Sequence, residues 1–532
     1  MQYQTQVVVI GAGIAGLVTA LELARAGKQV LVVDRESAKR VGGLARTAFG
    51  GMALVGTREQ KRMGVPDTPA IAYDDWCGFA EFEPDEVWPK AWAKAYTENC
   101  RTQVYDWLQA LGMSFMPAVN WVERGQYGVG NSLPRYHVLW GTGLGLVQTI
   151  LAKLSEYSQF VSFLQEHRVD ALHTRGGSVH ACSGINLLTD DAFEIEAEII
   201  VVASGGINGS IENVIKHWPE ARSTAAQENL LSGAHPFADG RLHEQLAALG
   251  ACITHQSDMW NYAAGVSHPK PEFDGHGLSL IPCKSALWLD HTGRRIGPSP
   301  LVTGFDTHDL CNQVSRFPQT WQVLNWHIAA HELAVSGAEH NGAIRDHKCV
   351  RFLWQLLRGN HALVQRMLDE CPDFIVADSL EGLIEKMRDL TPNLPVDGDA
   401  VKASVAGFDR ALSRAPRLQN DEQIRRVLHA RQWRPDRLRT VKPAPISLPK
   451  HGPLIAIRCR LISRKSLGGI QTDLNSAVQT VTHECLSGVY AVGEAAGFGG
   501  GGASGKRSLE GTFLAGCILT ARAAAAHINS IL

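Results

Sequence analysis

The sequence lacks several features that would indicate other protein classes. Its eleven cysteines are scattered and none forms a CxxC pair, so we expect neither a metal site nor a disulfide scaffold. No apolar run is long enough to cross a bilayer, and internal repeats are absent. A formal net charge of −2 over 532 residues gives no electrostatic case for nucleic-acid binding. No signal peptide is visible, and we expect a cytoplasmic protein with reduced thiols.

The first thirty-four residues predict a dinucleotide-binding unit. Residues 7–10 and 30–33 are short β-branched runs typical of buried parallel strands, and a helical pattern lies between them. Asp34 follows the second strand, in reach of a ribose hydroxyl pair. Three glycines follow the first strand as GxGxxG: Gly11, Gly13 and Gly16. They allow a tight turn, close approach of a pyrophosphate and close helix packing, while the helix N-terminus attracts phosphate.

The far end of the chain indicates which dinucleotide. A strand at residues 489–492 runs into Gly493 and Glu494, and a helical stretch from Thr512 to Ile528 closes the protein. This arrangement resembles the closing unit of two-dinucleotide-binding-domain flavoproteins. The resemblance implies FAD, with Glu494 on the ribitol and the start of the last helix (Gly511, Thr512 and Phe513) facing the flavin. The glycines from Gly141 have the wrong spacing and no strand of their own, so we expect no nicotinamide site.

Further segments sharpen this resemblance. GGLARTAFGG near residues 42–51, EIIVVASGGINGS at 198–210 and DGRLHEQLAALGA at 239–251 occur in the order found in the fumarate reductase/succinate dehydrogenase flavoprotein superfamily. Within it the chain looks most like the 3-ketosteroid Δ1-dehydrogenase branch. The match is specific over about the first 260 and last 70 residues and loose between them.

The resemblance implies a set of cofactor-binding residues. Gly42, Gly43, Thr47, Ala48, Gly50 and Gly51 would lie at the pyrophosphate and the flavin edge. Val169 would meet the adenine, and Ala203, Ser204 and Gly205 would line the same end. Ile14, Ala15 and Arg35 complete the set.

Departures from the superfamily are equally informative. Where succinate dehydrogenases carry the histidine that attaches FAD, this chain has Leu44, which has no nucleophilic nitrogen, so FAD should be non-covalent. No proton-donating arginine follows Arg295, and Lys465 stands where fumarate reductases keep a histidine. A dicarboxylate substrate is therefore disfavoured.

The predicted fold is α/β, a two-dinucleotide-binding-domain flavoprotein whose Rossmann-like FAD domain carries an inserted α+β cap. We assign the FAD domain to residues 1–260 and 463–532 and the substrate cap to 261–462, where the βαβ rhythm is lost and helical stretches appear. The cap would act as a lid.

Catalysis in this superfamily needs a proton carrier and a group that polarises a carbonyl. Tyr262, at the predicted cap entrance, is the first candidate, followed by Tyr136 and its neighbour His137. Ketosteroid dehydrogenases have a tyrosine where alignment places Lys506. We expect Lys506, with a pKa lowered by burial, to polarise the carbonyl beside Arg507. Contacts to the flavin phosphates or to solvent are the alternative.

One stretch of the predicted cap is strongly basic. Between Arg414 and Lys450 lie ten Lys or Arg residues and three acidic ones. A solvated face is the favoured interpretation; attraction of an anionic substrate or of an anionic membrane surface is the alternative.

We therefore predict an FAD-dependent oxidoreductase that exchanges a hydride between flavin N5 and a C–C bond beside a carbonyl, acting on a fairly apolar ketosteroid-like or cyclic ketone. Its electron partner is not specified by the sequence. An ene reductase of the fumarate-reductase type is the alternative enzyme. A non-catalytic binding module of related fold is disfavoured by the glycine loop, Asp34 and Glu494.

Overall fold

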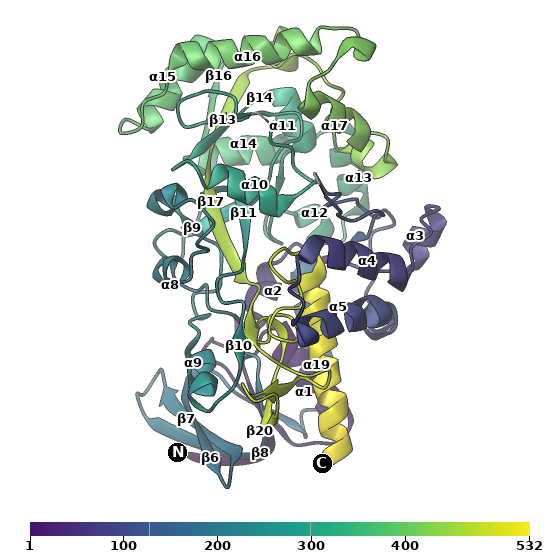
Figure 1. Ribbon diagram of the computed structural model, residues 1–532, viewed down its shortest axis with the longest axis vertical. Helices are drawn as coiled ribbons and strands as arrows, with labels where there is room; N and C mark the ends of the chain where they lie inside the picture. Colours follow the sequence, from purple (N-terminus) through teal and green to yellow (C-terminus); the bar gives the residue numbers. More distant parts are fainter. Residues whose placement is uncertain (127, 298) are drawn as a thin grey trace. The chain divides into compact units, whose positions relative to one another are not determined.

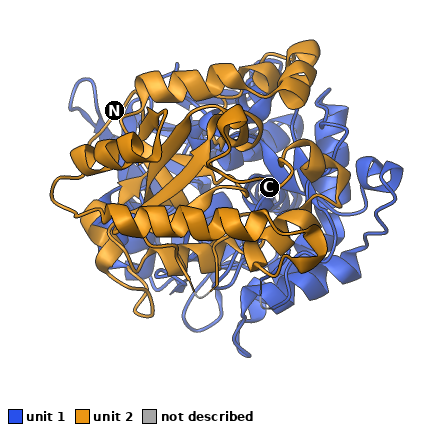
Figure 2. Cartoon of the chain, turned by 90° about the horizontal axis from the view of Figure 1, so that it is seen from above, with its two compact units in different colours: residues 1–217, 234–260, 465–532 blue, residues 218–233, 261–464 orange. Residues whose placement is uncertain are grey.

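The computed structural model describes residues 1–126, 128–297 and 299–532. The chain divides into two compact units, coloured separately in Figure 2. Unit 1 comprises residues 1–217, 234–260 and 465–532, and unit 2 comprises 218–233 and 261–464. Unit 2 therefore takes in residues 218–233, which the sequence assigned to the first domain. No helix of the described ranges is both long and apolar enough to cross a membrane.

Unit 1 is built on a largely parallel sheet. β1 lies between β2 and β8, and the order β20-β8-β1-β2-β5 is parallel throughout, with β19 antiparallel at the edge. β6 and β7 extend the sheet from β8 as an antiparallel pair. The strands are β1 (Gln2–Ile10), β2 (Val30–Val33), β5 (Val161–Leu164), β6 (His167–Arg175), β7 (Ser178–Asn186), β8 (Ala192–Val202), β19 (Ala477–Gln479) and β20 (Cys485–Ala491).

Three helices of unit 1 pack together beside this sheet: α1 (Ile14–Arg25), α7 (Thr142–Ser155) and α19 (Thr512–Ile531). Figure 1 labels α1 and α19. Ten of the twelve residues of α1 are buried, because the helix lies between the sheet and α19. Burial on most sides explains why the helix is apolar apart from Thr19, Glu22 and Arg25.

The remaining elements of unit 1 are short and mostly connect the core strands. They are α2 (Gly43–Thr47), β3 (Gly51–Ala53), α3 (Arg58–Arg62), α4 (Pro69–Ala80), α5 (Val87–Asn99), η1 (Cys100–Asp106), α6 (Trp107–Ala110), β4 (Tyr136–Val138), α8 (Ile211–Lys216), α9 (Arg241–Ala248), β10 (Ile253–Thr254), β18 (Gly469–Ile470) and η5 (Gly493–Ala495). A strand, β4, does precede the helix after Gly141, contrary to our expectation. It pairs antiparallel with β3, so it forms no second βαβ unit.

Unit 2 combines a second sheet with peripheral helices. The sheet has the order β13-β14-β17-β11-β12-β15, with β16 and β9 also paired to β17. Its strands are β9 (Leu231–Ser232), β11 (Met259–Ser267), β12 (Gly277–Ile281), β13 (Leu287–Asp290), β14 (Thr320–Asn325), β15 (Ala334–Val335), β16 (Phe374–Ala377) and β17 (Leu454–Ser466). The first two residues of β11 and the last two of β17 belong to unit 1.

The helices of unit 2 occupy mainly the sequence between β13 and β17. They are η2 (Ala225–Asn229), α10 (Thr307–Val314), α11 (Trp326–Glu332), α12 (Gly342–Arg345), α13 (Cys349–Arg358), α14 (His361–Glu370), α15 (Leu380–Leu390), α16 (Gly398–Leu412), η3 (Pro416–Leu418), α17 (Glu422–Ala430), α18 (Arg434–Leu438) and η4 (Pro449–His451). The chain thus combines a parallel βαβ unit with a separate α+β unit. This confirms the predicted fold class.

Candidate active site

The loop after β1 admits only glycine at two of its three motif positions. Gly11 has φ +110°, and a Cβ there would collide with the carbonyl oxygen of Ala203. A Cβ on Gly16 would collide with the carbonyl oxygen of Gly11. These two glycines therefore fix the tight turn and the close approach of α1 to the sheet.

Gly13 differs, because nothing within the protein opposes a side chain there. Its φ of −70° and ψ of 175° suit any residue, and a Cβ would have no neighbour within 4 Å. Gly13 is also the N-cap of α1, whose first turn contains Ile14 and Ala15, no acidic residue and no side-chain cap. The N–H groups at this end and the open space before them are suited to an anion such as the predicted pyrophosphate.

Gly42 and Gly43 lie directly against this loop. The Gly42 N–H donates to the carbonyl of Ala12 at 3.0 Å, and a Cβ on Gly43 would lie 3.3 Å from the Cα of Gly13. Gly42 and Gly43 both have positive φ. Close packing of the two glycine loops places the predicted pyrophosphate residues together, ahead of Thr47, Ala48 and Gly50 on and after α2.

Asp34 connects the glycine loop to the predicted adenine end. Its carboxylate accepts from the N–H of Ala12 at 2.5 Å and of Glu36 at 2.7 Å. The N–H of His167, at the start of β6, donates to the Asp34 carbonyl at 2.9 Å. This bond brings β6 and Val169 to the end of β2, while Ala203, Ser204 and Gly205 follow β8, two strands away in the same sheet.

Arg35 is held beside the same strand end by unit 1 itself. Its guanidinium forms an ion pair with Asp239 at 3.0 Å, bonds the carbonyl of Phe237 and stacks 4.3 Å from the Phe237 ring centroid. Burial lowers the pKa of Arg35 although Asp239 opposes that shift. The arginine therefore holds the loop at 237–239 in place, and it also borders the predicted adenine end of the site.

Glu494, in η5, is fixed against two residues that sequence analysis missed. Its Oε1 accepts from the N–H of Ser466 at 3.1 Å, and a Cβ on Gly206 would collide with that carboxylate. Gly493 has φ +66° and donates to Thr520 Oγ1 at 2.9 Å. The double glycine after β8, Gly205 and Gly206, could have indicated this close approach from the sequence. No sequence pattern pointed to Ser466.

The start of α19 is a second uncapped helix N-terminus. Its N-cap Gly511 has φ +97°, and the first turn contains neither an acidic residue nor a capping side chain. The Gly511 carbonyl accepts from Ala53 N–H of β3 at 2.8 Å. A Cβ on Gly511 would lie 2.9 Å from Cδ2 of Tyr136, so the helix start, β3 and β4 meet at one point.

These features fit FAD. Two uncapped helix N-termini, open space at Gly13 and a carboxylate at each of two strand ends, Asp34 and Glu494, match the needs of a pyrophosphate, a ribose and a ribitol. All of these residues belong to unit 1.

Tyr136 lies at the predicted flavin edge. A Cβ on Gly51 would collide with the Tyr136 hydroxyl, and the tyrosine ring also borders Gly511. Gly51 and Tyr136 lie on the paired strands β3 and β4. The phenol therefore reaches the start of α19, where the resemblance placed the flavin ring.

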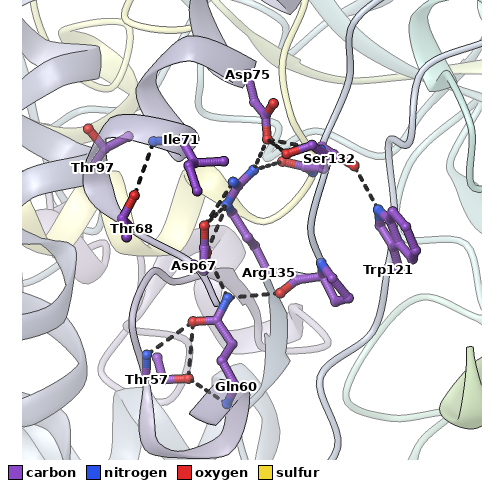
Figure 3. A network of polar contacts seen from close by, with 12 residues as sticks. Thr57, Gln60, Asp67, Thr68, Ile71, Asp75, Thr97, Trp121, Ser132 and Arg135 are labelled. Atoms are coloured by element: carbon purple, nitrogen blue, oxygen red, sulfur yellow. Dashed lines mark hydrogen bonds and ion pairs between the residues drawn. The ribbon is translucent and has the colours of Figure 1, made fainter. Parts of the chain in front are cut away.

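A buried polar network immediately precedes Tyr136 (Figure 3). The Arg135 side chain, 4% exposed, forms ion pairs with Asp67 at 2.9 Å and Asp75 at 2.5 Å. Gln60 Nε2 donates to Asp67 at 2.8 Å and to the Pro134 carbonyl at 2.8 Å. Because Arg135 is the residue before β4, this network fixes the strand that presents Tyr136. Its members are far apart in sequence and gave no pattern to find them by.

Lys465 reaches the same helix start from β17. Its Nζ lies 4.3 Å from the ring centroid of Phe513, in the first turn of α19. Phe498 and Trp260 pack against that ring at centroid distances of 4.9 and 5.5 Å. The next residue, Ser466, contacts Glu494, so Lys465 lies between the predicted ribitol and flavin ends.

His137 is placed where it cannot easily exchange protons with a substrate. It is fully buried, its Nδ1 donates to the Arg135 carbonyl at 2.7 Å, and its Nε2 lies 2.7 Å from Thr57 Oγ1. Burial lowers its pKa to about 4. Both ring nitrogens are used within unit 1, which argues against His137 as the further proton carrier that we expected beside Tyr136.

Lys506 and Arg507 are tied to the end of α4. Lys506 pairs with Glu83 and Arg507 with Glu81 at 2.8 Å. The expectation of a lowered Lys506 pKa is wrong, because the ammonium is exposed and its bond to Glu83 raises the pKa. Two such pairs hold the loop before α19 against the carbonyl end of α4, where cations are favoured.

The remaining candidates lie in unit 2. Tyr262 is half-buried on β11. Of the ten basic residues from Arg414 to Lys450, seven are exposed, and three are half-buried: Arg426, Arg431 and Arg439. Both assignments stay predictions.

One group in the described part of the chain could hold a metal ion: His268, Glu339 and His340. Nε2 of each histidine lies 2.9–3.0 Å from Glu339 Oε1. However, Nδ1 of His268 accepts from the Lys270 N–H and Nδ1 of His340 from Arg366. In the neutral rings each Nε2 therefore carries the proton, and that of His268 is hydrogen-bonded to Glu339, which argues against metal ligation.

Comparison with known proteins agrees with this geometry. The profile of a family described as an FAD binding domain matches residues 6–514. A KsdD-like steroid dehydrogenase of Mycobacterium tuberculosis is 41% identical over 97% of this chain and 94% of its own. The structure of 3-ketosteroid Δ1-dehydrogenase from Sterolibacterium denitrificans in complex with 1,4-androstadiene-3,17-dione covers 99% of this chain and 100% of its own, with TM-score 0.71 and 14% identity.

The open conformation of a flavocytochrome c3 fumarate reductase has TM-score 0.69 and 19% identity, covering 99% of this chain and 78% of its own. Similarity at this level shows a shared fold.

Proposed function

Because the chain belongs to the FAD-binding domain family, we propose that it is an FAD-dependent dehydrogenase acting on a C–C bond beside a carbonyl in a ketosteroid-like substrate. The observation that carries this proposal is that the Tyr136 ring borders Gly511, the N-cap of α19, while the Lys465 ammonium lies 4.3 Å from the ring centroid of Phe513 in its first turn. Similarity to a KsdD-like steroid dehydrogenase along almost the whole chain supports the substrate class.

Each of the two side chains suits one part of this chemistry. When bound, FAD supplies the hydride acceptor. Lys465, a cation held over Phe513, polarises the substrate carbonyl and stabilises negative charge that develops on its oxygen. Tyr136 takes up or relays the proton lost from the neighbouring carbon. Tyr262 of unit 2 stays a prediction for the same step, and His137 holds β4 in place.

We propose that FAD is bound without a covalent link, since Leu44 occupies the attachment position. The electron acceptor is unassigned, and a cytoplasmic location stays a prediction.

The function is tested by adding substrates anaerobically to the purified yellow protein. A saturated ketosteroid should bleach the flavin, and turnover should follow with an artificial electron acceptor; cyclohexanones and dicarboxylates complete the panel. Reaction of only the dithionite-reduced protein, and only with activated alkenes, would establish an ene reductase instead. A protein that stays colourless with added FAD would be a binding module.

The residue roles are tested by Lys465→Met and Tyr136→Phe. Each should retain FAD. Lys465→Met should lower turnover by roughly 10²–10³-fold, the effect of losing one donor to a developing oxyanion, and Tyr136→Phe by roughly 10²–10⁴-fold, the effect of losing a general acid–base group. Lys506→Met is the matched control, because it removes an exposed ammonium paired with Glu83. Normal turnover in both test variants would overturn the assignment.

A further inference from the structure

α13 exposes an apolar stripe to solvent. Val350, Leu353, Trp354 and Leu357 are 84%, 54%, 63% and 67% exposed, and no residue of the helix is buried. Their i, i+3, i+4, i+7 spacing is the pattern by which a helix ordinarily buries one face. The helix is attached by its other side, where Phe352 and Leu356 are half-buried.

The charged residues of α13 itself are both basic. Arg351 and Arg358 are exposed, and the Arg358 guanidinium lies 5.4 Å from the Trp354 ring centroid. From residue 347 to 368 the sequence contains three arginines and one lysine and no Asp or Glu. Lys348 does contact Asp346, but that carboxylate is already paired with Arg345. The segment is therefore both apolar and cationic.

We propose that α13 docks on an anionic lipid surface. A helix with leucine and tryptophan on one face and arginine beside it lies in the plane of the membrane interface, its apolar side chains reaching the acyl boundary. Arginine contributes attraction to anionic headgroups. The ten-residue helix, about 15 Å long, is too short to span a bilayer, so binding is peripheral. A second copy of the chain would also cover the apolar stripe, but it would not explain why the charged residues of the helix are all basic.

The test is flotation of the full FAD-loaded protein with two kinds of vesicle. One contains phosphatidylcholine alone, and the other contains about 30% phosphatidylglycerol as well. The protein should float with the anionic vesicles, and high salt should weaken binding. Leu353→Gln/Leu357→Gln should lower the apparent affinity at least tenfold. Brominated lipid should quench tryptophan fluorescence in the wild type, and the quenching should fall in Trp354→Phe.

The matched control is Leu188→Gln/Val481→Gln, which removes two side chains that are 70% and 67% exposed on unit 1. This variant should float like the wild type, and both double variants should keep their flavin absorbance. Equal flotation of the wild type and the α13 variant, or equal binding to neutral vesicles, would overturn the proposal. A wild-type dimer that becomes a monomer in the α13 variant, without vesicle binding, would instead identify a second copy as the occupant.

Discussion

Replacing Gly13 by alanine should separate cofactor binding from folding. In the protein itself the new Cβ would meet no atom within 4 Å, and the backbone at φ −70° accepts alanine without strain. The flavin-free variant should therefore be as stable as the wild type or slightly more, since Gly→Ala at a compatible site contributes about 0.4–1 kcal/mol. A loss of FAD would then reflect the space the pyrophosphate needs.

The size of that loss follows from the bonds at the N-terminus of α1. A Cβ on Gly13 would push the pyrophosphate away from N–H groups that no side chain caps. Each charge-assisted hydrogen bond contributes about 1.5–3 kcal/mol, so losing one or two weakens FAD binding by about 3 kcal/mol, or roughly a hundredfold. The measurement is a fluorescence titration of flavin-free protein with FAD, beside a thermal melt of the same sample.

Gly16→Ala is the contrasting variant, because its Cβ would collide with the Gly11 carbonyl. It should lower the melting temperature of the flavin-free protein as well as FAD binding. An unchanged FAD Kd in Gly13→Ala would refute the placement of the pyrophosphate, and a destabilised flavin-free Gly13→Ala would refute the open space before α1.

Three further outcomes are expected. Arg135→Met should lower the free energy of unfolding by about 3–5 kcal/mol in chemical denaturation, because it leaves two buried carboxylates without their cation. A decrease of less than about 1 kcal/mol, the contribution of a surface ion pair, would contradict a network from which water is excluded. The folded pKa of buried His137, about 4, lies below its ordinary 6.5, so its contribution is complete above pH 6.5 and is lost as the pH falls towards 4. The acid-induced fall in denaturation free energy between these values should be smaller in His137→Gln. Finally, acid precipitation should release all flavin into the supernatant, because Leu44 offers no attachment point; flavin remaining with the denatured chain would contradict this.

The sequence by itself determined the nucleotide unit, because its parts are local. The glycines at 11, 13 and 16 act within one strand–turn–helix segment, and their spacing encodes that geometry directly. The closing strand, Glu494 and last helix form a second local unit. The fold class was implied by the family resemblance that these units carry, together with the change of rhythm between them. The sequence did not show that residues 218–233 join unit 2, since that grouping depends on pairing of β9 with β17.

The surroundings of the catalytic candidates were decided only by the tertiary structure. Tyr136 occupies the space that Gly51 and Gly511 leave open. Lys506 is not buried as predicted but bonds Glu83, a residue 423 positions away in the sequence. Such contacts join distant segments, so no local pattern encodes them. The same holds for α13, which lies within the helical stretches expected from the sequence: only packing decided that Phe352 and Leu356 face the protein while Trp354 faces solvent. Spacing fixes which residues share a face, and the tertiary contacts fix which face is covered.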